Sequence, residues 1–264
     1  MLRRVTSLVR CTVLEPVVAE LQVAVAAGHP VNELLEVELD GVPLDVEEHA
    51  TTAGGRLHRV RACTGELVAR YRGDVGGAAA VAVEPLDDST WLRPSRYVES
   101  DRLAAFASAE LGHLQEAADL LPAAAAWVGS RLRYVSGSSD PTDGAVETLL
   151  AGEGVCRDYA HLVVALLRAR DVPARVVSVY APGLHPMDFH AVAEALVDGA
   201  WHVVDATLLA PRSSLVRVAT GRDAADTAFL STYGGLVQFE AMEVTAVVVG
   251  DLPDDDPARA VQLS

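Results

Sequence analysis

The chain has 264 residues, half of them hydrophobic, and a formal net charge of −16 at pH 7. That charge repels phosphate backbones and argues against a nucleic-acid partner. No apolar run approaches the roughly 18 residues that cross a bilayer, and the basic start lacks a signal-peptide core, so we expect no membrane association. The three scattered cysteines, Cys11, Cys63 and Cys156, form no disulfide framework, and we expect a reducing, cytoplasmic location.

The first third of the chain has the pattern of a β-domain. Between residues 2 and 83, short runs of alternating polar and apolar side chains are separated by turn residues, as in half-buried strands. Turns at Gly41 and at Thr64-Gly65 predict two hairpins. We therefore predict a β-rich N-terminal domain over residues 1–85, joined to the rest by a proline-containing connector over residues 84–101.

From residue 102 the apolar spacing changes to three and four residues, which is typical of helices packed on one side. The last and most apolar of these helices begins at Cys156, directly after a glycine-flanked loop. A thiol at a helix N-terminus is favoured as the thiolate, because the helix dipole and free backbone amides stabilise negative charge there. Helices are predicted over residues 101–112, over 114–135 with a break at Pro122, from 145 to a terminal glycine, and over 156–170.

Two predicted strands, 189–197 and 200–207, flank an Asp-Gly dipeptide at residues 198–199. This dipeptide is the strongest hairpin signal in the chain, and a two-residue loop places Val197 opposite Ala200. The register of the whole hairpin follows from that pair, because a slip by one residue would move every side chain to the other face.

The register predicts a histidine beside a carboxylate. His190 lies opposite Thr207 and Val192 lies opposite Asp205, so His190 and Asp205 are diagonal neighbours on one face. Such neighbours are roughly 7–8 Å apart at Cα, within side-chain reach. If the Cys156 helix packs against the same sheet, the three residues supply a nucleophile, a base and an orienting acid.

The remaining elements complete one core. A buried strand over 174–180 precedes the hairpin, and a short helix near 223–229 and a long strand over 236–250 follow it. We assign residues 86–250 to this core, with helices packed on an antiparallel sheet, and predict an α+β fold. The tail, residues 251–264, is acidic and is expected to be disordered.

The segments GVCRDYAHL, DFHAVAE and WHVVDAT together resemble the bacterial transglutaminase-like family, a branch of the papain-like cysteine superfamily. The order Cys, His, Asp and the helix-then-hairpin context match over about residues 91–235, and the N-terminal region more loosely resembles the β-domain often found ahead of that core. The resemblance implies Cys156 as nucleophile, His190 as base and Asp205 as orienting acid. Many relatives have Trp two residues after the histidine, where this chain has Val192, so the wall beside the substrate is expected to differ.

The chemistry that the resemblance implies is acyl transfer at an amide of a peptide, a protein or a small carboxamide. The thiolate attacks the carbonyl, ammonia or an amine leaves, and water or an amine resolves the thioester. The family includes proteases, amidases and transglutaminases, and we favour hydrolysis over cross-linking. No cofactor and no metal are implied. The Cys156 backbone N–H is one expected oxyanion donor at the helix start, and Tyr180 is a candidate for the second.

Two other functional interpretations stay open. The first is a catalytically silent binding or scaffold protein that keeps the same fold. The second is a metal site. It would use His185, Asp188, His190 and His202, but His202 has the opposite strand parity from Asp205, and no familiar ligand spacing is present.

Several other side chains have both a structural and a functional interpretation. His161 either packs within its helix or supports the site from behind. For the three arginines near the C-terminus we favour ion pairs over a substrate pocket, and for the two remaining cysteines we favour packing on strands. These residues are Arg212, Arg217, Arg222, Cys11 and Cys63.

Overall fold

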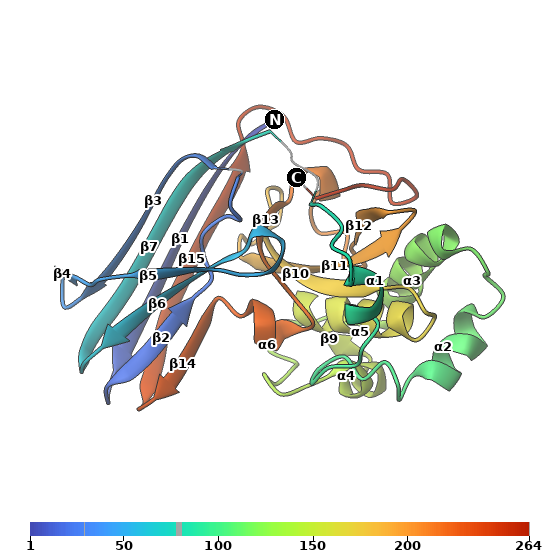
Figure 1. The fold of residues 1–264 in the computed structure, drawn as a ribbon, viewed down its shortest axis with the longest axis horizontal. Helices are drawn as coiled ribbons and strands as arrows, with labels where there is room; N and C mark the ends of the chain where they lie inside the picture. Colours follow the sequence, from blue (N-terminus) through green and yellow to red (C-terminus); the bar gives the residue numbers. More distant parts are fainter. Residues whose placement is uncertain (29, 78–80, 264) are drawn as a thin grey trace.

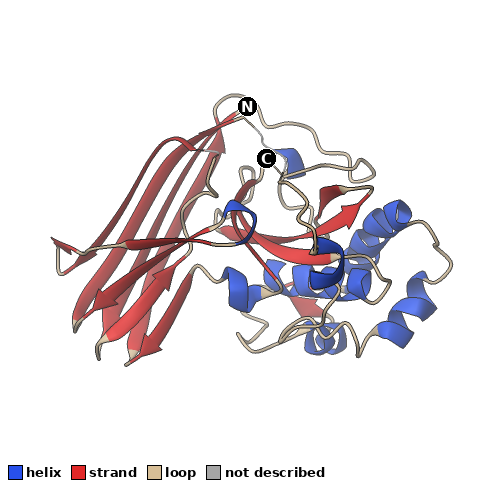
Figure 2. Cartoon of the chain, in the orientation of Figure 1, coloured by secondary structure: helices blue, strands red, loops and turns tan. Residues whose placement is uncertain are grey.

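The computed structural model describes residues 1–28, 30–77 and 81–263. It has two halves that lie side by side, a β-sandwich and a smaller sheet with helices packed on it (Figure 1 and Figure 2). The α+β class expected from the sequence is confirmed. Within the described residues, no helix is long and apolar enough to cross a membrane.

The sandwich consists of two antiparallel sheets that face each other. Its strands are β1 (Leu2–Val13), β2 (Val17–Leu21), β3 (Pro30–Leu39), β4 (Val42–Pro43), β5 (Glu47–Ala50), β6 (Arg56–Ala62), β7 (Gly65–Gly76), β14 (Leu230–Gly234) and β15 (Val237–Val248), with a 3₁₀ turn at Thr52–Gly54. The sheet orders are β15-β1-β7-β3-β4 and β14-β2-β6-β5. Every second residue of β1 points inward and is buried, and the inward side chains of both sheets share one apolar core.

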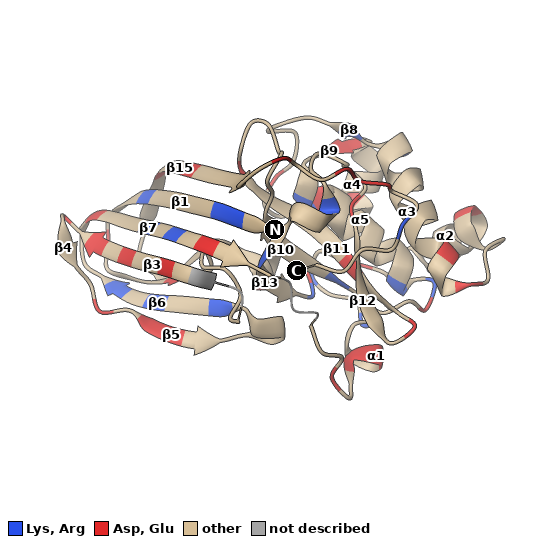
Figure 3. Cartoon of the chain, turned by 90° about the horizontal axis from the view of Figure 1, so that it is seen from above, with Lys and Arg blue, Asp and Glu red and all other residues tan. Residues whose placement is uncertain are grey.

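The outer face of the larger sheet carries many of the charges (Figure 3). Arg4 on β1 lies 2.9 Å from Asp74 on β7, and Arg70 on β7 lies 2.8 Å from Glu38 on β3. Exposed cross-strand pairs of this kind each stabilise the fold by only about 0.2–1 kcal/mol. Their main consequence is a polar, solvated face.

The prediction of a hairpin around Thr64 and Gly65 is wrong. β6 pairs with β2 and β5, whereas β7 pairs with β1 and β3, so the chain crosses from one sheet to the other at this point. Gly65 adopts a φ of 151°, and the next backbone N–H, of Glu66, donates to the Asp40 side chain (2.8 Å). Alternation is the same in a hairpin and in a sandwich crossover, which is why the pattern did not distinguish them.

The long C-terminal strand, which the sequence predicts as part of the core, belongs to the sandwich instead. β15 pairs along its whole length with β1, and β14 pairs with β2. Without β15, one long side of β1 would have unpaired backbone amides and carbonyls. The chain therefore leaves the sandwich, builds the second half, and returns to close the sandwich. The division at residues 85 and 86 stays a prediction, but residues 236–250 do not belong to the core's sheet.

The second half is built on a sheet of order β12-β11-β10-β13. Its elements are α1 (Asp87–Thr90), α2 (Ala104–Leu111), α3 (Ala117–Arg131), β8 (Arg133–Tyr134), α4 (Ala145–Ala151), β9 (Glu153–Gly154), α5 (Cys156–Arg168), β10 (Ala174–Tyr180), β11 (Phe189–Val197), β12 (Ala200–Val204), a 3₁₀ turn at Arg212–Ser214, β13 (Val216–Gly221) and α6 (Ala224–Thr227). α5 contacts β10, β11, α3 and α4, and its apolar side chains join Ala193 and Ala195 of β11 in one core. α3 continues through Pro122, where a break was expected.

The hairpin of β11 and β12 has the register that the sequence predicts. Val197 pairs with Ala200 and Ala193 with Val204. Asp198 and Gly199 have φ values of 51° and 72°, so both turn residues are in the left-handed region that a type I′ turn requires. Asp tolerates that region better than most residues and Gly adopts it freely, so this dipeptide fixes the register.

The two halves share a packed interface rather than a flexible linker. Tyr180 at the end of β10 is completely buried. Its hydroxyl donates to the Val23 carbonyl (2.7 Å) and is hydrogen-bonded to the Ser7 hydroxyl (2.9 Å), both in the N-terminal part of the chain. Its ring stacks on Tyr71 of β7, with 6.3 Å between centroids. The sandwich therefore supports the sheet that carries the hairpin.

The tail is ordered against the core, contrary to expectation. The Val203 N–H of β12 donates to the Val261 carbonyl (2.8 Å), and Leu263 is buried against the sheet beside Val203. Asp255 accepts hydrogen bonds from the backbone and the guanidinium of Arg212. Burial raises the pKa of Asp255, but Arg212 outweighs burial and lowers it. A few anchoring residues thus hold a segment whose average composition predicts disorder.

We expect Asp255→Asn to lower the free energy of unfolding by about 2 kcal/mol, because the nearly buried Arg212 would lose its charged acceptor. Urea titration followed by circular dichroism measures this change. Asp254→Asn is the matched control, since it removes the same charge from the same segment at an exposed position. Equal effects of the two substitutions would show that the ion pair does not anchor the tail.

Candidate active site

Cys156 is the first residue of α5, so its backbone N–H has no partner within the helix. The preceding residue, Val155, is extended, and its N–H donates to the Asp158 carboxylate (2.8 Å), which is the half of a capping box that an N3 side chain supplies. A Cβ on Gly154 would lie 2.7 Å from the Cβ of Asp158, so the chain enters the helix here only with glycine. These features fix the thiol at a positive helix end, partly accessible to solvent.

The hairpin brings His190 and Asp205 into contact. The His190 Nε2 lies 3.1 Å from Asp205 Oδ2, and both side chains are almost completely buried. Thr207 fixes the carboxylate, because its hydroxyl (2.7 Å) and its backbone N–H (2.8 Å) both donate to Asp205 Oδ1. The predicted neighbours on one face are therefore confirmed as a hydrogen-bonded pair.

The charges at this pair depend on burial and on neighbouring groups. Burial alone lowers the pKa of His190, but the Asp205 carboxylate and the Cys156 sulfur outweigh burial and raise the pKa to about 10. Burial raises the pKa of Asp205, but His190 and Thr207 outweigh it, and the net shift is downward. The arrangement thus stabilises the imidazolium form of His190 beside the Asp205 carboxylate.

The geometry distinguishes the two nitrogens of His190. Nε2 is held by Asp205, whereas Nδ1 is buried without a hydrogen-bond partner among the described residues. The Cys156 sulfur is near enough to affect the charge of the ring, although it does not meet hydrogen-bond geometry with Nδ1. Such bonds are often long in enzymes without substrate. The free nitrogen is therefore available to the thiol.

The sequence missed Tyr134, and Tyr180 is wrong as a site residue. Tyr180 is held inside the interface between the halves. Tyr134 lies on β8, which pairs in parallel with β9. Its partner on β9 is Gly154, which is two residues before Cys156 in the sequence. Burial raises the pKa of Tyr134 and negative charge on Cys156 raises it further, whereas the Cys156 backbone lowers it. The only sequence signal was a tyrosine after a helix, which is too common to be informative.

Asp188 also lies near these groups. Its carboxylate accepts a hydrogen bond from the Phe189 N–H (2.7 Å), and its charge acts on both His190 and Tyr134. Burial raises the pKa of Asp188, with the Phe189 amide and His190 opposing that shift. It therefore lies near the site and, among the described side chains, forms no ion pair within 4 Å, although the charge of His190 acts on it.

The three arginines form ion pairs, as favoured from the sequence. Arg212 binds Asp255, Arg217 binds Glu194, and Arg222 binds Asp226. Arg217 and Glu194 are buried inside the core. Cys11 is buried on β1 as expected, but Cys63 is exposed at the crossover between the two sheets.

The residues considered for a metal do not converge. His202 pairs with Ala195 on β11, and strand alternation places it on the face opposite His190. Among the described residues, no group of three or more His, Cys, Asp or Glu side chains is arranged to hold a metal ion.

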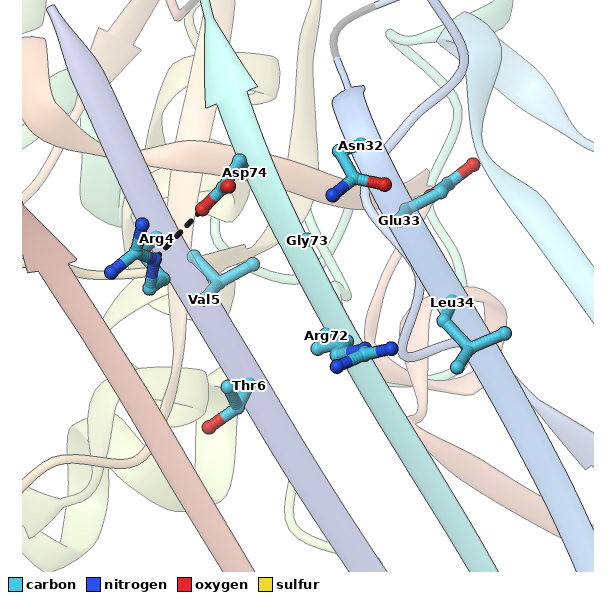
Figure 4. A pocket seen from close by; sticks show the side chains of 9 residues that line it. All are labelled: Arg4, Val5, Thr6, Asn32, Glu33, Leu34, Arg72, Gly73 and Asp74. Carbon is cyan, nitrogen blue, oxygen red and sulfur yellow. Dashed lines mark hydrogen bonds and ion pairs between the residues drawn. The ribbon is translucent and has the colours of Figure 1, made fainter.

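A separate groove lies on the sandwich (Figure 4). It has a volume of about 300 Å³ and follows the solvent face of β1, β7 and β3, beside the Arg4–Asp74 ion pair. None of the residues near Cys156 lines it. Its lining residues come from three adjacent strands and most of them are exposed on the solvent face, so it is a surface furrow of the sheet and not part of the site.

A buried histidine held by a carboxylate and facing a thiol at a helix N-terminus is the site of the papain-like class of cysteine proteins. The model of the Transglutaminase-like superfamily matches residues 105–206, which include Cys156, His190 and Asp205. A crystal structure of a candidate cysteine protease from Cytophaga hutchinsonii is 32% identical, covers 97% of this chain and 93% of that chain, and superposes with a TM-score of 0.87. The chain belongs to the transglutaminase-like superfamily.

Mycobacterial proteins are also similar to this chain. An uncharacterized protein of Mycobacterium leprae, ML0607, is 28% identical over 148 residues, which are 52% of this chain and 52% of that protein. An uncharacterized protein of Mycobacterium tuberculosis, Rv2569c, is 51% identical over 47 residues, 18% of this chain and 15% of that protein. The similarity thus spans about half the length of the first of these relatives and a small part of the second.

His161 supports the fold behind the site. It is completely buried on α5, its Nε2 accepts the Ala224 N–H of α6 (3.0 Å), and its ring stacks on Tyr97. Burial lowers the pKa of His161 to about 4. The ring is therefore neutral in the folded protein at pH values where the unfolded chain already binds a proton.

We expect His161 to make stability depend on pH. Because its pKa is near 6.5 when unfolded and about 4 when folded, the free energy of unfolding should fall as pH decreases through this interval, by about 3 kcal/mol from this group. Chemical denaturation between pH 7 and pH 4 measures the slope. His161→Gln keeps an acceptor for Ala224 and should flatten the slope. An unchanged slope would show that other groups cause the acid sensitivity.

Proposed function

We propose that the protein is a cysteine-dependent enzyme that transfers or hydrolyses the acyl group of an amide through a thioester. The observation that supports it is the orientation of His190, with Nε2 on Asp205 and Nδ1 free toward Cys156. A histidine that served only to fill the core would be expected to bond both ring nitrogens or to be neutral. His190 is buried and charged, and its Nδ1 has no hydrogen-bond partner among the described residues.

In the proposed reaction Cys156 is the nucleophile and His190 acts first as an acid and then as a base. The Cys156 thiolate adds to the carbonyl carbon, and the carbonyl π electrons move to the oxygen. The Cys156 N–H stabilises that oxyanion at the helix start. His190 donates its proton to the leaving amine, the C–N bond breaks, and the thioester remains. His190 then removes a proton from water or from an acceptor amine, whose attack releases the acyl group.

Hydrolysis is the preferred outcome. The Cytophaga hutchinsonii relative is described as a candidate cysteine protease, which supports a peptide or protein substrate, and the thioester intermediate is common to both outcomes. A cytoplasmic location stays a prediction from cysteine usage. Screening peptides and small carboxamides with detection of released ammonia and amines distinguishes protease from amidase activity.

The competing proposal is a silent binding protein on the same fold, and the reactivity of the cysteines separates the two. Cys63 is exposed, whereas Cys156 is only partly exposed. An ordinary pair of thiols would react with iodoacetamide in the order of exposure. We expect the opposite order, with Cys156 alkylated at least about tenfold faster, because the imidazolium and the helix N-terminus favour its thiolate. Mass spectrometry of the modified peptides measures both rates.

Acylation by p-nitrophenyl acetate gives the catalytic half of this test. The wild type and Cys63→Ala should form an acetyl thioester at Cys156 with a burst of nitrophenolate, and Cys156→Ala should not. Faster alkylation of Cys63, with no thioester at Cys156, would favour the scaffold protein.

We expect Asp205→Asn to lower the rate of acylation by about 10²–10⁴-fold while the fold is preserved. An asparagine amide can still accept from Thr207, but its NH₂ donates to His190 Nε2, which forces the proton onto Nδ1 and removes the base that faces the thiol. Asp198→Asn, on the turn of the same hairpin, is the control and should leave the rate unchanged. Similar losses in both variants would point to damage of the hairpin instead.

A further inference from the structure

The Cys156 N–H alone leaves the oxyanion with one donor, and β8 supplies a second polar group at the same place. β8 and β9 form a short parallel pair, held by the Arg133 N–H on the Gly152 carbonyl and the Val135 N–H on the Gly154 carbonyl, both at 3.0 Å. Since β9 leads directly into α5, these bonds fix β8 relative to the thiol. Tyr134 lies between the two bonds.

The side chain of Tyr134 lies over the first turn of α5. Its ring is 5.9 Å from the ring of Tyr159, which shares a helix face with Cys156 because the two are three residues apart. The Tyr159 hydroxyl donates to the Leu132 carbonyl (2.8 Å), just before β8. The ring contact between the two tyrosines therefore joins the strand to the helix. The Tyr159 hydroxyl is already bonded to a backbone carbonyl, which leaves the Tyr134 hydroxyl as the one to consider.

Tyr134 is paired with Gly154, two residues before Cys156, and its ring packs on Tyr159 of α5, so its hydroxyl is close enough to Cys156 for both the sulfur and the backbone of that residue to affect its pKa. The hydroxyl makes no hydrogen bond with any other residue in the described part of the chain. The residue is 44% exposed, so a substrate carbonyl can approach its side chain from solvent. A tyrosine that only packed would bury its ring and need no thiol at its polar end.

Resting on the proposed function, we propose that Tyr134 is the second oxyanion donor, its O–H acting together with the Cys156 N–H. When the thiolate adds to the carbonyl, the oxygen that gains the electron pair accepts from both groups, and it releases them when the C–N bond breaks. The proton stays on Tyr134 throughout, because its pKa is raised well above the ordinary value.

Two reactions of the same thiol separate this role from a structural one. Acylation by p-nitrophenyl acetate passes through a tetrahedral oxyanion, whereas alkylation by iodoacetamide is a direct displacement that forms none. Removing one oxyanion donor typically lowers such a rate by about 10²–10³-fold. We expect Tyr134→Phe to lower acylation of Cys156 by about 10²-fold and to change its alkylation by less than about threefold. Stopped-flow nitrophenolate release and timed mass spectrometry measure the two rates.

Tyr159→Phe is the matched control. It removes a tyrosine hydroxyl from the same strand-to-helix contact, and it should lower thermal stability without changing the ratio of the two rates. An unchanged acylation rate in Tyr134→Phe, or an equal fall in both reactions, would overturn the assignment. A wild-type protein that is alkylated but never acylated at Cys156 would instead overturn the proposed function.

Discussion

The contact between His190 and Asp205 is the constraint on which the rest of the site depends. Both groups are buried and charged, so each is tolerable in the core only with the other present. The type I′ turn at residues 198–199 sets which residues face each other. A slip by one residue would place the carboxylate on the other face of the sheet, against apolar side chains, and leave the imidazole unpaired. Turn chemistry and buried charge therefore select the same register.

A second set of buried charges fixes the same sheet further along the strand. Glu194 on β11 is completely buried and is bonded to Arg175 on β10 and Arg217 on β13. Burial raises the pKa of Glu194, but the two arginines outweigh burial and lower it. Because one carboxylate spans three adjacent strands, the strands cannot slide without separating an ion pair in the core. The same three strands include β11, which carries His190, so these ion pairs also fix the register of the strand that carries His190.

Local signals predicted the site better than they predicted the path of the chain. The helix that starts at Cys156 and the Asp-Gly turn are each encoded within a few residues, so the start of the helix and the contact of His190 with Asp205 could be predicted. The partners of β6, β7 and β15 could not, because an alternating strand fits any sheet with one buried face. The tail shows the same limit: Asp255 and Leu263 are held by Arg212 and by the core, partners that are distant in sequence.

The proposed role of Tyr134 shows why an oxyanion donor is the hardest part of a site to find in a sequence. The nucleophile and the base are identified by rare residue types in a particular order, but an oxyanion donor can be any N–H or O–H that the backbone brings near the thiol. Here that proximity comes from a two-residue parallel strand pair, β8 with β9, which has no periodicity to recognise. The two strands pair in parallel because the segment between them, which contains α4, brings the chain back to the end of β8 at which that strand begins. The loop-helix segment from residue 136 to residue 152 thus delivers the cysteine beside a tyrosine that lies 22 positions earlier in the sequence.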